Sequence, residues 1–178
     1  MSKIGRQPIF IPQGVAVSLN DGAVTVLGPK GSQTRAISSE VRVINDGTTL
    51  KVESSNPVLW GTWRAHIFNM VQGVSKGFQK NLELQGIGYK VGLQGSSLVF
   101  QIGFSHPVTV PIPEGLACEL KENIISVKGI NKEAVGQFAA SLRGLKPPDA
   151  YKGKGIRYQG EVIKLKPGKK AGVGAGAS

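Results

Sequence analysis

The sequence predicts an α+β fold of two tandem duplicated domains, each a small antiparallel β-sheet packed against one α-helix, followed by a basic C-terminal extension. Three observations support this: a segment that recurs at a fixed offset, apolar residues that alternate at period two, and two segments with helical spacing. The 178 residues suit two domains of roughly 80 to 90 residues each. We expect an N-terminal domain at 1–81, a C-terminal domain at 82–170 and a disordered Gly/Ala-rich tail at 171–178.

The duplication rests on Ile11–Ala16, which recurs as Ile112–Ala117 at an offset of 101 residues. The same offset continues without a gap, and it pairs Leu19 with Leu120, Val24 with Ile125, Val26 with Val127 and Gly28 with Gly129. A short Ile-Pro-x-Gly motif can arise by chance, but strand periodicity that stays in register over the following residues favours duplication.

Two hairpins and a helix are expected in the first copy. Alternating apolar residues predict strands on either side of a turn at Asn20–Gly22, and a second hairpin turns at Asp46-Gly47. Asn56 is expected to cap the helix, with Pro57 at its first position. Apolar residues then follow at helical spacing and are expected to face the core, both tryptophans included: Trp60, Trp63, Ile67, Met70, Val71 and Val74.

The second copy opens with a longer β-rich stretch, Leu82–Val110, with a hairpin through Gln94–Ser97. Its apolar residues, up to Phe104, sit mostly at even spacing. A helix should begin after Asn131 as N-cap and stop at Gly144. The two domains are expected to join near residues 79–82.

The composition limits the classes of function. The formal charge of +11 points to a polyanionic partner, either nucleic acid or an anionic membrane surface. The single cysteine, Cys118, cannot form an internal disulfide, which suits a reducing compartment. Residues 1–14 lack the features of a signal peptide, and no apolar run is long enough to span a bilayer, so we expect a soluble protein.

The sequence predicts no enzyme, no cofactor and no metal site. Gly86–Gly92 has the wrong glycine spacing for a dinucleotide loop, and Gly28–Ser32 lacks the spacer of a phosphate-binding loop. His66 and His106 belong to no recognisable nucleophile pattern and are interpreted as structural or surface residues.

The charge concentrates between Arg143 and Lys170, where nine basic residues oppose Asp149 and Glu161 for a net +7. Lysine and arginine neutralise phosphates, glycine lets the backbone approach them, and tyrosine stacks on bases. A flexible solvated loop remains an alternative, and composition does not separate RNA from DNA. The candidate RNA-binding residues are Tyr151, Lys152, Gly153, Lys154, Gly155, Arg157, Tyr158, Arg143, Lys146, Lys164, Lys166, Lys169 and Lys170.

Four motifs give the sequence a family resemblance: Pro148–Ile156, Gly28–Gly31, Asn69–Phe78 and Gly103–Val108. In their order along the chain they resemble the motifs of the bacterial-type large-subunit ribosomal protein six family (the universal L-six family), and they are spread over nearly the whole chain. The resemblance implies a non-catalytic structural constituent of the large ribosomal subunit that binds its rRNA close to the sarcin-ricin loop and the stalk base. Neighbouring ribosomal proteins and nearby translation factors would be its other partners, and it would be ribosome-bound in the cytoplasm or in an organelle.

Two departures from the family pattern are visible: Ala150, where many members have a second proline, and the uncharged end of the chain.

If the basic segment neutralises about six to nine phosphates, log affinity for RNA should fall against log salt concentration with a slope of roughly −4 to −8. Other classes considered are an adaptor for an acidic protein, a peripheral membrane protein, against which the prolines of the basic segment argue, and an RNA-modifying enzyme.

Overall fold

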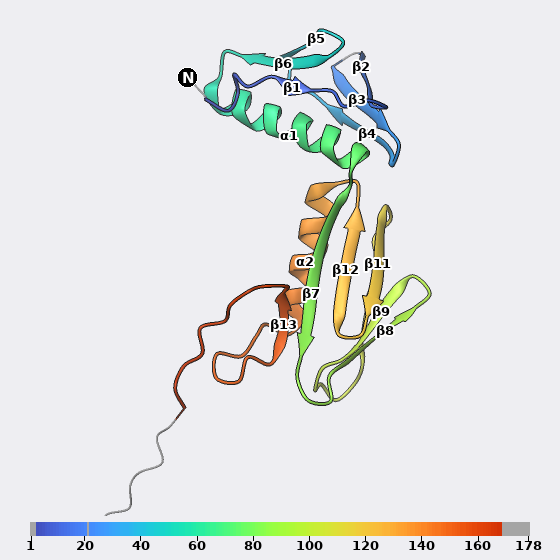
Figure 1. The fold of residues 1–178 in the computed structure, drawn as a ribbon, viewed down its shortest axis with the longest axis vertical. Helices are drawn as coiled ribbons and strands as arrows, with labels where there is room; N and C mark the ends of the chain where they lie inside the picture. Colours follow the sequence, from blue (N-terminus) through green and yellow to red (C-terminus); the bar gives the residue numbers. More distant parts are fainter. Residues whose placement is uncertain (1–2, 21, 169–178) are drawn as a thin grey trace, which may run out of the picture. The chain divides into compact units, whose positions relative to one another are not determined.

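A computed structural model describes residues 3–20 and 22–168. The described chain forms two compact units: one has the residues up to Lys80 with Pro113–Ala117 and Val127–Phe138, and the other has Asn81–Ile112, Cys118–Ser126 and the residues from Ala139 on. The predicted domain limits stay a prediction. In chain order (Figure 1) the elements are β1 (Ile9–Phe10), β2 (Ala16–Asn20), β3 (Ala23–Gly28), β4 (Gly31–Ala36), β5 (Val41–Asn45), β6 (Thr49–Ser54), α1 (Pro57–Ser75), β7 (Phe78–Gln85), β8 (Lys90–Gln94), β9 (Ser97–Gln101), β10 (Val108–Pro111), β11 (Leu116–Lys121), β12 (Ile124–Gly129), α2 (Lys132–Leu145) and β13 (Gly155–Tyr158).

Both hairpins predicted for the first copy are confirmed. Strands β2, β3 and β4 form one antiparallel sheet, in which Asn20 pairs with Ala23. Strands β1, β6 and β5 form a second sheet, in which Val43 pairs with Val52 on either side of the turn that holds Gly47. Gly47 has φ 82°, a conformation that glycine adopts without steric cost.

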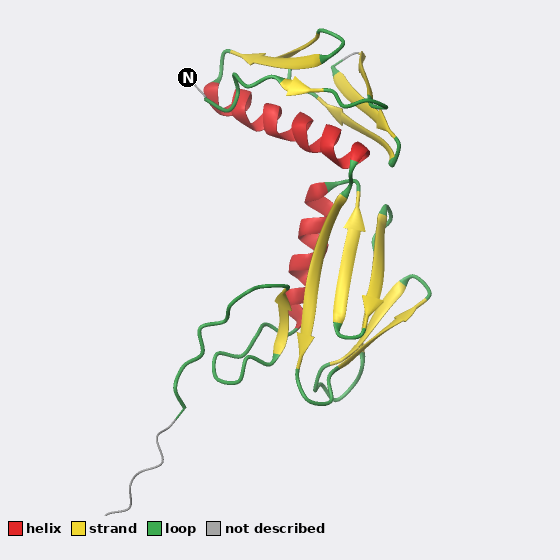
Figure 2. Ribbon diagram, in the orientation of Figure 1, coloured by secondary structure: helices red, strands yellow, loops and turns green. Residues whose placement is uncertain are grey.

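Helix α1 lies along these two sheets (Figure 2). The Asn56 side chain accepts a hydrogen bond from the Val58 N–H at 3.1 Å, which confirms the predicted N-cap. Ile67, Met70, Val71 and Val74 are buried among strand residues, and both tryptophans pack half-buried against the same core. The predicted apolar face of the helix is therefore the one that closes the core.

The structure agrees with the duplication in detail. Strands β11 and β12 fall where the offset of 101 places β2 and β3, and the second-copy turn contains Glu122 with φ 52°. A Cβ at Gly28 would lie 2.8 Å from the Val74 side chain of α1, and one at Gly129 would lie 2.9 Å from the Val135 side chain of α2. Both copies thus need a glycine where the strand meets its helix.

The second copy has two sheets, β11-β12-β7-β13 and β10-β9-β8, and the predicted hairpin through Gln94–Ser97 is confirmed. The predicted junction at residues 79–82 lies inside the uninterrupted strand β7. One detail was wrong: Phe104 does not continue the strand alternation but follows β9 in an exposed loop. The sheet therefore ends earlier than the even spacing of apolar residues indicated.

Helix α2 packs on β12 through Val135, and it buries Phe138, Ala139 and Leu142. Asn131 caps it as predicted, accepting a hydrogen bond from the Glu133 N–H at 2.9 Å. The predicted stop at Gly144 is wrong by one residue, because Gly144 lacks a positive φ and the helix continues to Leu145. The prolines that follow end it instead.

Within the described ranges, neither helix combines the length and the apolar character needed to cross a lipid bilayer.

Candidate nucleic-acid interface

The basic loop, defined as residues 146–154, connects α2 to β13 and is closed by its own hydrogen bonds. The Asp149 N–H donates to the Lys154 carbonyl at 2.9 Å, and the Gly153 N–H donates to the Asp149 carbonyl at 2.9 Å. The Asp149 carboxylate accepts from the Lys152 N–H at 3.1 Å. These hydrogen bonds restrict the conformation of the loop, which would reduce the conformational entropy that binding a partner costs.

Two glycines of this region are required by the shape of the loop. Gly153 has φ 68°, a conformation that disfavours any side chain. Gly155 has φ 144°, and a Cβ there would lie 2.6 Å from the Pro147 carbonyl oxygen. Their presence is explained without a phosphate nearby, so the interpretation that glycine allows close backbone approach to RNA stays a prediction.

Strand β13, which the sequence did not predict, anchors the end of the loop. It pairs antiparallel with β7, Gly155 with Gln85 and Tyr158 with Leu82, and Ile156 is fully buried. Beyond it, the Lys166 N–H donates to the Ala150 carbonyl at 2.8 Å. The following segment thus returns to the basic loop, which places two lysine-bearing stretches side by side.

The two predicted arginine contacts are engaged within the protein. Arg157 donates to the Glu83 carboxylate from Nε and Nη2, at 3.0 and 2.9 Å. Arg143 donates to the Glu161 carboxylate from Nε and Nη2, at 3.2 and 2.7 Å. The hydrogen bond from Arg143 and a second from the Tyr158 N–H hold the pKa of Glu161 below its ordinary value. Both arginines therefore hold the region together, and less of their charge is available to a polyanion.

The predicted lysines face outward to different extents. Lys152, Lys164 and Lys166 are exposed, whereas Lys146 and Lys154 are half-buried. The Lys146 ammonium lies 5.0 Å from the centre of the Phe104 ring. Lys169 and Lys170 lie outside the described residues, as does the tail from 171 to 178 that was expected to be disordered.

The two tyrosines differ. The Tyr151 residue is 59 % exposed and can present its ring to a partner. Tyr158 is half-buried, with the Arg143 guanidinium 5.8 Å from its ring centre, which suits a structural role better than base stacking. Two shallow hollows share Lys152 and Gly153 in their lining. Each also contains exposed apolar side chains that were not predicted as site residues: Ile87 in one hollow, and Val162 and Leu165 in the other.

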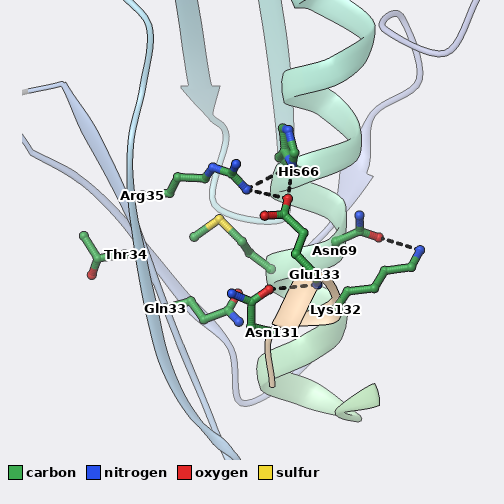
Figure 3. Close-up of a pocket in the computed structure, with 9 residues that line it drawn as sticks. Gln33, Thr34, Arg35, His66, Asn69, Asn131, Lys132 and Glu133 are labelled. Carbon is green, nitrogen blue, oxygen red and sulfur yellow. Dashed lines mark hydrogen bonds and ion pairs between the residues drawn. The ribbon is translucent and has the colours of Figure 1, made fainter. Parts of the chain in front are cut away.

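A second polar cluster lies in a pocket formed by β4, α1 and the start of α2 (Figure 3). Glu133 Oε1 lies 2.9 Å from Arg35 Nη1 and 3.0 Å from His66 Nδ1. The hydrogen bond from Arg35 holds the pKa of Glu133 below its ordinary value. A carboxylate whose charge is stabilised by an arginine is a poor general base, so the geometry of this cluster does not suggest catalysis.

Residues 3–20 and 22–168 contain no group of three or more histidine, cysteine or acidic side chains that could hold a metal ion. A loop whose lysines lie close together at the surface is typical of a protein that binds nucleic acid.

Comparison with known proteins defines the class further. The family model described as "Ribosomal protein L6" matches residues 11–77 and 85–159, one match in each copy of the repeat. The chain is 49 % identical over 175 residues to "Large ribosomal subunit protein uL6" of Oenococcus oeni, covering 95 % of this chain and 98 % of that protein. It is 48 % identical to the protein of the same name from Carboxydothermus hydrogenoformans, covering 98 % and 99 %, and 47 % identical to that of Persephonella marina, covering 97 % and 99 %.

The chain belongs to the ribosomal protein L6 family. Membership confirms the family resemblance seen in the four motifs, and with it a structural role without catalysis.

Proposed function

We propose that this protein is a structural constituent of the large ribosomal subunit and that it binds large-subunit rRNA through the basic loop and the returning segment 159–168. The partner is the rRNA backbone, which the loop recognises mainly by shape, because the major groove of A-form RNA is too narrow for side chains. Phosphates, ribose hydroxyls and the minor groove would provide the contacts.

The observation that carries this proposal is the balance of charge on the surface of the basic loop and the returning segment. Lys152, Lys164 and Lys166 are exposed there, with Lys146 and Lys154 half-buried beside them. Both acidic residues between Arg143 and Gly168 already have partners within the protein: Asp149 accepts a hydrogen bond from a loop N–H, and Glu161 forms an ion pair with Arg143. The remaining cations have no carboxylate partner within the segment, which favours a polyanion.

The position on the ribosome is the finer part of the proposal and rests on the family resemblance. Contact near the sarcin-ricin loop and the stalk base would bring the protein next to other ribosomal proteins and to bound translation factors. It would then support subunit assembly and translation. The named relatives are all bacterial, which favours a ribosome-bound protein in a bacterial cytoplasm.

Cofractionation tests the proposal. The tagged full-length chain, expressed in a bacterium, should remain with large subunits after a high-salt wash and be released by ribonuclease. A variant with Lys152, Lys154, Lys164 and Lys166 replaced by alanine should be lost in the wash, whereas Arg42→Ala/Lys51→Ala should remain bound. Ribonuclease-resistant association with a protein would instead indicate the adaptor alternative.

Chemical probing tests the position. In subunits reconstituted with and without the protein, nucleotides near the sarcin-ricin loop and the stalk base should lose reactivity when it is present. Protection confined to other regions of the rRNA would refute the proposed position while leaving rRNA binding intact.

A further inference from the structure

Phe104 differs in exposure from the two large apolar residues that precede it. Phe100 and Ile102 are buried at 0 % and 1 % exposure, whereas Phe104 is 46 % exposed. Residues 103–107 are all exposed. Single exposed apolar residues are common at protein surfaces, so the exposure of Phe104 carries an argument only together with the groups that surround its ring.

The Tyr89 ring packs against the loop that carries Phe104. The Tyr89 N–H donates to the Gly86 carbonyl at 3.2 Å, and a Cβ at Gly86 would lie 2.4 Å from the tyrosine ring. The same ring passes within 3.4 Å of where a Cβ of Gly103 would be, and Gly103 has φ 81°. Phe104 therefore follows directly after a turn that packs against the Tyr89 ring.

Beside the ring is an open hollow with no acidic side chain in its lining. It is lined by Gly88, Gln101, Gly103, Phe104, Ser105, His106 and Pro107. Amide, hydroxyl and imidazole groups at its rim can hydrogen-bond the edge of a base, and the absence of carboxylates there avoids repulsion of a phosphate.

Lys146 connects this hollow to the basic loop. Its ammonium lies 5.0 Å from the Phe104 ring centre, and its carbonyl accepts a hydrogen bond from the Ile156 N–H at 2.7 Å. The backbone at Lys146 is thus fixed at the base of the loop while its side chain reaches the ring. An aromatic surface next to a cation that continues a basic surface is the combination that binds an unstacked nucleotide.

We propose that Phe104 is a stacking platform for one unpaired rRNA base, which would use the ring face opposite the Lys146 ammonium, and that Lys146, which lies over the ring, neutralises the adjoining phosphate. This inference rests on the proposed function and extends it, because it adds a base contact to an interface otherwise made with the backbone. It also accounts for the exposure of the ring, since bound RNA would cover it.

The test uses the full-length protein and deproteinised bacterial large-subunit rRNA. Phe104→Tyr keeps an aromatic ring, and Phe104→Leu keeps an apolar side chain without one. Phe68→Ala is the matched control, because Phe68 is also exposed, at 40 %, and lies 4.8 Å below the Arg64 guanidinium. For each folded variant, affinity is measured over a range of salt concentrations, and base reactivity is mapped along the bound rRNA.

Phe104→Leu should weaken binding by about 5- to 100-fold, with an unchanged salt slope because the ring carries no charge. One or two unpaired bases should change reactivity, while Phe104→Tyr and Phe68→Ala bind as the unmodified protein does. If Phe104→Leu binds normally with the same reactivities, or if Phe68→Ala weakens binding equally, the stacking site is refuted. Failure of the proposed function would look different, since the lysine variants of the basic loop would then bind normally too.

Discussion

The double variant Lys152→Ala/Lys154→Ala should reduce the salt dependence of rRNA binding by a calculable amount. Each phosphate neutralised contributes roughly 0.7 to 0.9 to the slope of log affinity against log salt. Removing two lysines should therefore make the slope shallower by about 1.4 to 1.8. Affinity should fall most at low salt, where counterion release contributes most.

The structure also sets the slope expected for the unmodified protein. Of the nine basic residues between Arg143 and Lys170, the two arginines are paired with Glu161 and Glu83, and Lys169 and Lys170 lie outside the described residues. Five lysines remain, which gives a slope of roughly −3.5 to −4.5 from them alone. With Lys169 and Lys170 included, the slope would be roughly −4.9 to −6.3, which is shallower than nine free cations would give because the two arginines are paired with carboxylates.

The assay is filter binding of the full-length protein to large-subunit rRNA between about 50 and 200 mM salt. Arg42→Ala/Lys51→Ala is the control, since it removes two exposed cations from β5 and β6, and it should leave the slope unchanged. If this control changed the slope as much as Lys152→Ala/Lys154→Ala does, the charge of the whole protein would matter and the basic loop would not be the interface.

Three further predictions concern stability. Gly155→Ala should lower the free energy of unfolding by about 1 to 3 kcal/mol in urea titrations, because its φ is 144° and its Cβ would lie 2.6 Å from a carbonyl oxygen. Gly136→Ala is the control, since a Cβ there meets nothing within 4 Å, and it should not lower the free energy of unfolding. Equal effects of the two substitutions would contradict the packing argument. Because Arg143 lowers the pKa of Glu161, that pair should stabilise the protein at neutral pH and stop doing so as the pH falls through the lowered pKa. Thermal melts should show a smaller acid-side loss for Glu161→Gln, and an identical pH profile would argue against the pair. Asn56→Ala should cost about 1 kcal/mol through loss of the α1 cap, measured by urea unfolding against Ser55→Ala; a value near zero would argue against capping.

Local signals in the sequence predicted the hairpins and helix starts well. The alternation around Asn20–Gly22 and the cap at Asn56 depend on residues a few positions apart, so the sequence contains the whole interaction. The duplication was visible because both copies keep the same spacing of apolar residues and glycines. These features required no knowledge of distant contacts.

The interface was less predictable because its geometry comes from distant partners. Strand β13 has one fully buried apolar residue, Ile156, and forms only because β7, more than 70 positions earlier, offers an edge. The pairing of Arg157 with Glu83 crosses the same distance, so Arg157 was counted as an RNA contact. Phe104 was assigned to a strand because its spacing was even, although Gly103 turns the chain away.

Directed hydroxyl-radical probing tests the central claim, that the basic loop lies along large-subunit rRNA. Lys152→Cys in a Cys118→Ser background would carry tethered iron, with Lys51→Cys as the control, and both would be incorporated into large subunits. We expect cleavage of rRNA strands near the sarcin-ricin loop from position 152 and a different pattern, or none, from position 51. Absence of rRNA cleavage from position 152 in subunits that contain the protein at normal occupancy would contradict the claim.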